Sequence, residues 1–183
     1  MLVCRASGAL CVRAVCLFGL LALASTPVLA ARNLVVLESP RTVRADAALA
    51  TELDDMRARS ATFRAQCGRL DTADRLVVLL RLNPALPQGF FRARTTLHRY
   101  TSGLLVAVVE VAPGADQAGW IAHEFEHILE QLDGQDLPVL ARRQARGVWR
   151  SVDGMIETTR ATDAGRRVLA ELRVIELHDN FVE

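Results

Sequence analysis

The stretch W-I-A-H-E-F-E-H-I at residues 120–128 decides the fold, because it places two histidines four positions apart. On an α-helix, His123 and His127 project about 40° apart, so both side chains point to the same side. That spacing suits a tetrahedral zinc ion that takes one imidazole nitrogen from each residue. We therefore predict a zinc site on a helix over residues 116–132.

The other side of the same helix is apolar. Its stripe lies about 140–180° from His123 by helical geometry and consists of Ile121, Phe125, Ile128 and Leu132. We expect the histidines to lie away from the core, either on a metal or, in a domain without metal, on a solvated face. Glu124 projects about 100° from His123. In enzymes with an H-E-x-x-H motif, this glutamate acts on the metal's water instead of binding the metal.

Glu157 is the predicted third zinc ligand, since a catalytic zinc takes three protein ligands and leaves a position open. The predicted last helix covers residues 154–175, and Glu157 heads its apolar stripe, where a carboxylate is costly unless it is paired or bound to a metal. The stripe consists of Ala161, Ala164, Val168, Leu172 and Ile175.

Asp133 is the alternative third ligand. It lies ten residues after His123, as in the pattern H-E-x-x-H-x-x-G-x-x-H/D, but position 130 holds Glu130 instead of the glycine that turns the chain. Four further residues stay open as ligands, namely Asp153, Asp163, Glu171 and His178.

The His123-Glu124-x-x-His127 motif with a later glutamate resembles the gluzincin group of zincin metallopeptidases. The stretch I-E-T-T-R-A-T-D-A-G-R-R-V at residues 156–168 is also similar to a segment of small exported bacterial HExxH proteins of unassigned role. The resemblance implies an exported zinc metallopeptidase in which His123, His127 and Glu157 bind Zn²⁺ and Glu124 is the general base. Its partner would be a peptide or protein substrate.

Peptide hydrolysis by a zinc-bound water also needs a donor to the developing oxyanion. The candidates for that role, or for a supporting contact to the ligands, are Arg160, His98, Tyr100 and His178. The competing hypothesis is a non-catalytic exported protein that binds zinc as a structural or metal-handling site. A fourth protein ligand would distinguish that site from a catalytic one.

Residues 1–30 are typical of a secretory signal peptide, with Arg5 and Arg13 before a short apolar run and small residues before Ala30. We expect cleavage near Ala30, with Ala24 as the alternative and an uncleaved anchor as the competing interpretation. The product would be periplasmic or secreted, with no membrane contact after cleavage. Its 20 arginines against 21 acids, after loss of two of the 22, show no basic tract typical of nucleic-acid binding.

Hydrophobic periodicity predicts a 31–42 lead-in followed by a single α+β, minimal zincin-like domain over residues 43–183. We expect N-terminal helices, a small three-stranded sheet with a hairpin at Gly103, the HExxH helix and two further helices. The predicted helices are 43–56, 60–70, 116–132, 137–148 and 154–175, and the strands are 75–82, 90–100 and 104–111, with a short strand at 34–37.

Overall fold

A computed structural model describes residues 42–86 and 92–179, the side chains of 174–179 excepted. The predicted signal peptide and the 34–37 strand lie outside these residues. The described elements are β1 (Val43–Ala45), α1 (Ala47–Arg59), α2 (Ala61–Asp71), β2 (Leu76–Leu82), β3 (Ala93–Arg99), β4 (Leu105–Val111), α3 (Gln117–Leu132), α4 (Leu137–Arg142), β5 (Val148–Arg150), β6 (Ile156–Thr158) and α5 (Thr159–Asp179). The α+β class is therefore confirmed. None of the described helices is long and apolar enough to cross a bilayer.

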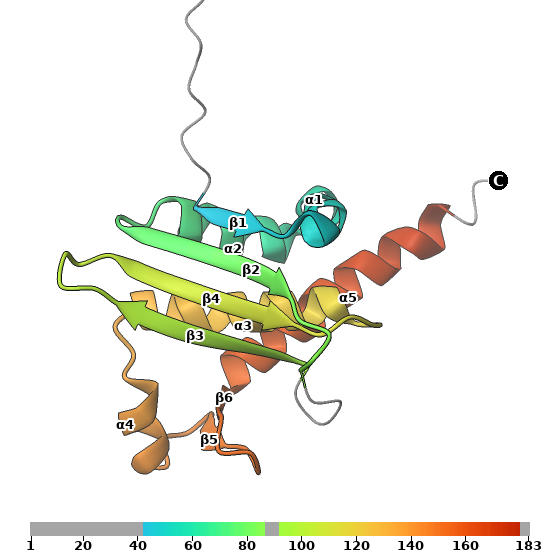
Figure 1. The fold of residues 1–183 in the computed structure, drawn as a ribbon. Coiled ribbons are helices and arrows are strands. Elements are labelled where there is room, and N and C mark those ends of the chain that lie inside the picture. The colour runs from blue at the N-terminus through green and yellow to red at the C-terminus, as the bar shows by residue number, and fades with distance from the viewer. Residues whose placement is uncertain (1–41, 87–91, 180–183) are drawn as a thin grey trace, which may run out of the picture. The chain divides into compact units, whose positions relative to one another are not determined.

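The main sheet has four strands in the order β1-β2-β4-β3 (Figure 1). Strands β1, β2 and β4 are parallel, and β3 is an antiparallel edge strand joined to β4 by the predicted hairpin. The fourth strand, β1, corrects the prediction of a helix from residue 43. Val43 is buried and pairs with Val78, so sheet pairing overrides the helical pattern until Ala47.

Helices α1, α2 and α3 pack on one face of this sheet, and α5 packs against α3 (Figure 1). The inward residues of β2 and β4 alternate with half-buried ones, as a strand with one fully covered face requires. Phe63 of α2 stacks on Phe125 of α3, with ring centroids 5.4 Å apart, at the centre of this core.

The segment between α3 and α5 differs from the prediction. A helix was predicted over 137–148, but α4 ends at Arg142, and the chain then forms a β5–β6 hairpin. The last helix begins at Thr159 instead of 154. Gln144, Gly147 and Gly154 have positive φ angles of 51°, 78° and 79°, a region a right-handed helix does not use.

Candidate metal centre

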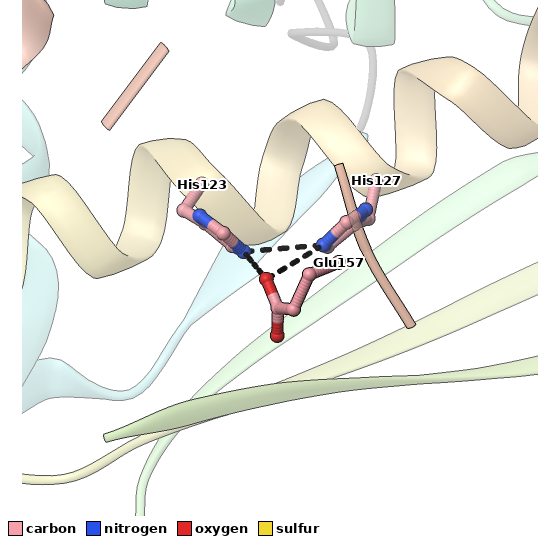
Figure 2. Close-up of side chains that lie close together, drawn as sticks. All are labelled: His123, His127 and Glu157. Carbon is pink, nitrogen blue, oxygen red and sulfur yellow. Dashed lines mark hydrogen bonds and ion pairs between the residues drawn. The ribbon is translucent and has the colours of Figure 1, made fainter. Parts of the chain in front are cut away.

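The structure brings His123, His127 and Glu157 together (Figure 2). The two histidine Nε2 atoms lie 3.1 Å apart. Oε2 of Glu157 lies 2.9 Å from Nε2 of His123 and 3.9 Å from Nε2 of His127. Two turns of α3 supply the imidazoles, and β6 supplies the carboxylate.

These three atoms fit a metal ion. Their separations of 2.9, 3.1 and 3.9 Å bracket the spacing of about 3.3 Å expected between tetrahedral ligands with bonds of about 2.0–2.1 Å. Three points with these separations lie on a circle of about 2.0 Å radius, so one position is within bonding distance of all three atoms. His, His and Glu are also the donor set of a three-ligand zinc site. The cluster therefore could hold a metal ion.

The cluster is largely shielded from solvent, since His123 is buried and His127 and Glu157 are partly buried. His123 is only 7% exposed, although the helical pattern placed the histidines away from the core. Of the predicted apolar stripe, Ile121, Phe125 and Ile128 are buried in the core, whereas Leu132, the last residue of α3, is 37% exposed. Helix α5 packs against α3 and the β5–β6 hairpin adjoins the cluster, so a second layer replaces the expected solvent.

Two glycines allow α5 to approach α3 closely. A Cβ atom at Gly165 would lie 2.6 Å from the backbone oxygen of Gly119 and 3.4 Å from Cβ of His123. A Cβ atom at Gly119 would lie 2.6 Å from the side chain of Leu169. Larger residues at this crossing would push the helices apart, and Glu157 precedes α5 by only two residues.

Glu157 lies on strand β6 and not on the predicted helix. It pairs across the hairpin with Trp149, so both side chains lie on the same face of this small sheet. The next residue, Thr158, caps α5 by accepting a hydrogen bond from the backbone N–H of Ala161 at 2.9 Å. The hairpin and the start of α5 therefore fix Glu157 from both sides.

Glu130 orients His127 through a hydrogen bond to the ring nitrogen that does not face the cluster. Nδ1 of His127 donates to Oε2 of Glu130 at 2.9 Å, which leaves Nε2 directed at the cluster. Burial lowers the pKa of His127, but Glu130 and Glu157 outweigh it and raise the pKa to about 9. For the acid Glu157, burial has the opposite effect and raises the pKa, but the hydrogen bonds and charges of His123 and His127 outweigh it and lower the pKa to about 2. A cation at this position is therefore electrostatically favoured.

Glu124 lies apart from the three ligands but shares a cavity with two of them. This cavity, of about 340 Å³, is lined by Glu124, His127 and Glu157 together with residues of β3, α4 and the hairpin. Oγ1 of Thr95 donates a hydrogen bond of 2.7 Å to Oε2 of Glu124 and so orients the carboxylate. Burial raises the pKa of Glu124, against the lowering effect of the nearby histidines and Thr95. A raised pKa suits a carboxylate that takes up and releases a proton.

A second cavity, of about 540 Å³, opens on the His123 side of the cluster. Glu157 lines both cavities. The second is the more apolar and includes both tryptophans, Trp120 and Trp149, with Arg166 at its wall. The cluster therefore lies between two cavities.

Asp133 and Arg160 have other contacts than those predicted. Asp133 follows the last residue of α3 and forms ion pairs of 2.6 Å with both Arg69 and Arg160, so the structure does not bring it to the histidines. Among the described residues Arg160 forms no hydrogen bond or ion pair with Glu157 or Glu124; its Nε donates to Oε1 of Glu126 at 2.5 Å. Arg160 thus ties the start of α5 to α3 beside the cluster.

Of the remaining candidates, His98 and Tyr100 do not reach the cluster. The residues of β3 that line the first cavity are Ala93, Thr95 and Leu97, so strand alternation places His98 on the opposite face of the sheet. Tyr100 follows β3, is 54% exposed and lines neither cavity. The side chain of His178 lies outside the described residues.

Three residues that contribute to the site were not predicted from the sequence. Glu130 lies three positions after His127, a spacing that brings side chains together on a helix, and this signal could have identified it. Thr95 and Trp149 lie far from the motif in sequence and reach it only through the fold. No family model, curated protein or solved structure matches the chain, so the site is defined by its own geometry.

Proposed function

We propose that the protein is an exported zinc-dependent metallopeptidase, with His123, His127 and Glu157 as the ligands and Glu124 as the general base. The observation that carries this proposal is the cluster of three ligand atoms together with a second, separate carboxylate, that of Glu124, in the same cavity. When bound, zinc would polarise a substrate carbonyl and lower the pKa of water at the site. The residues of the chain would supply the proton transfers and the substrate contacts.

Glu124 is suited to accept a proton from the attacking water and to pass it to the leaving amine. Its carboxylate is buried, oriented by Thr95 and not taken up by the ligand cluster. General acid–base catalysis of this kind contributes typically about 10²–10⁴-fold to the rate. Strand β3 forms the edge of the sheet and lines the first cavity, so an extended substrate could add to it as a further strand.

The competing structural zinc site is less well supported. Such a site is closed by a fourth protein ligand, whereas the described side chains supply three. The cluster also faces two cavities, which a purely structural site does not need. These two features favour an open, catalytic position.

Metal content of the untagged full chain tests the site, measured beside His127→Ala and Glu157→Gln. We expect about one zinc per chain in the wild type, a loss in His127→Ala and weakened binding in Glu157→Gln, as a three-ligand site requires. Glu124→Gln should keep the metal yet lose about 10²–10⁴-fold of its activity on a peptide library. The exposed Asp163→Asn is the matched control. A wild type that takes up no stoichiometric metal would refute the proposal.

A further inference from the structure

The first cavity lies between two acid-free stretches of sequence. In residues 38–183, the two longest stretches without Asp or Glu are 75–109 and 137–152. The first contains β3, and the second contains α4 and β5; both contribute to the cavity lining. In Figure 1, α4 and the hairpin lie beyond β3, on the side of the sheet away from β1.

The second stretch carries four exposed arginines, here called the arginine rim: Arg142, Arg143, Arg146 and Arg150. Among the described residues these arginines have no ion pair, and the one recorded contact is a hydrogen bond from Arg150 to the backbone oxygen of Gly154. Several arginines elsewhere in the chain are paired, such as Arg69, Arg94 and Arg160. The rim is therefore a local excess of positive charge in a nearly neutral chain.

The neighbouring acids do not cancel this charge. Asp136 caps α4 by accepting from the backbone N–H of Val139, and Asp153 lies at the turn of the hairpin. Counting both, residues 136–153 still hold four arginines against two acids.

We propose that the arginine rim docks acidic polypeptide segments and so selects acidic polypeptides as substrates of the adjacent site. That the docked segments are substrates rests on the proposed function. The docking itself needs no turnover. Arg150 connects the rim to the chemistry, because it lines the same cavity as Glu124 and His127. The strand edge of β3 favours an extended chain on the opposite wall.

Apolar side chains accompany the charges. Trp149, Val152 and Met155 on the hairpin are 43%, 87% and 39% exposed and line one or other cavity. An anionic bilayer would also meet such a mixture of charge and apolar surface. A polypeptide is favoured because these residues border the cavities that lead to the cluster, and a bilayer cannot enter them.

Peptide binding to the full-length Glu124→Gln protein tests the inference without cleavage. Anisotropy would be compared for a labelled Asp/Glu-rich peptide and for the same peptide with Asn/Gln, at about 0.05 and 0.5 M salt, which changes electrostatic screening strongly. We expect at least about tenfold tighter binding of the acidic peptide at low salt, from several exposed pairs acting together, and little preference at high salt.

Variants then locate the effect. Changing Arg142, Arg143 and Arg146 to Gln should remove most of the preference, and changing them to Lys should largely restore it. The matched control changes three exposed arginines elsewhere, Arg44, Arg64 and Arg167, to Gln and should keep the preference. Circular dichroism would verify that each variant is folded.

Equal binding of the acidic and neutral peptides, or an equal loss in the control, would overturn the inference. Binding to phosphatidylcholine vesicles that depends on added phosphatidylglycerol, without a peptide preference, would overturn it in favour of a membrane surface. If the protein binds no zinc and cleaves no peptide, only the proposed function is refuted, because the peptide-binding result still decides the role of the arginine rim.

Discussion

Replacing Gly165 by alanine should destabilise the protein, although it places a better helix former inside α5. In an unconstrained helix, Gly→Ala stabilises by about 0.5–1 kcal/mol. Here the new Cβ would lie 2.6 Å from the backbone oxygen of Gly119, and ordinary contact requires about 3.4 Å. The two helices must therefore separate by about 0.8 Å at their crossing.

That separation exceeds what a metal site tolerates. Ligand distances must stay within about 0.2 Å of their ideal values, and Glu157 is carried on the segment that leads into α5. Overpacking of this kind costs about 1–3 kcal/mol, and the gain in helix propensity offsets about 0.5–1 kcal/mol of it, so we expect a net loss of about 1 kcal/mol, and at most about 2.5 kcal/mol, in the free energy of unfolding. Zinc affinity should fall by about 10–100-fold, the range seen when ligand support is disturbed.

Urea denaturation of the metal-free protein would measure the first effect, and competition with a chelating dye would measure the second. Gly68→Ala is the matched control, because Gly68 lies in helix α2 with nothing within 4 Å of its would-be Cβ. It should raise stability slightly and leave zinc affinity unchanged. A Gly165→Ala protein with wild-type stability and zinc affinity would show that the crossing does not position Glu157.

Two further predictions concern the carboxylates of Glu130, which is buried, and Glu171, which is partly exposed. Glu130→Gln keeps a hydrogen-bond acceptor for His127 but removes its charge, and zinc affinity measured by dye competition should fall about tenfold; an unchanged affinity would exclude a supporting role. Burial raises the pKa of Glu171, but hydrogen bonds from Ser60 and Thr62 outweigh it and leave the pKa lowered from 4.5. The resulting stabilisation is complete above pH 4.5 and is lost as the pH falls through the lower folded-state value. In denaturant titrations from pH 7 to pH 3, Glu171→Gln should therefore be less stable at neutral pH and lose less on acidification; parallel curves would contradict this.

The parts of the fold that follow from local pattern were predictable. Strands β2 and β4 are apolar runs bounded by turn residues, and α3 has a clear helical period, so each was located to within a residue or two. Strand β1 was missed because three residues carry too little pattern to outweigh the helix that follows. The pairing that stabilises β1 is with residues more than thirty positions away.

In the candidate site, too, only the features that depend on local sequence pattern could be predicted. The spacing of His123 and His127 is a local property, and the structure keeps it. The argument for Glu157 assumed a helix, whereas Glu157 lies on a strand that runs directly into that helix. The burial of the histidines could not be inferred from α3 alone, since it depends on the close approach of α5 at Gly119 and Gly165.

The placement of the two tryptophans, the only ones in the chain, has an optical consequence. The ring of Trp120 lies 6.1 Å from that of His123, and Trp149 is the cross-strand partner of Glu157. Emission from both indoles should therefore respond to an ion held by the cluster, and a paramagnetic ion such as Co²⁺ should quench it. The unlabelled protein then carries its own readout of metal occupancy, and replacing either tryptophan by phenylalanine would separate the signal at the helix from the signal at the hairpin.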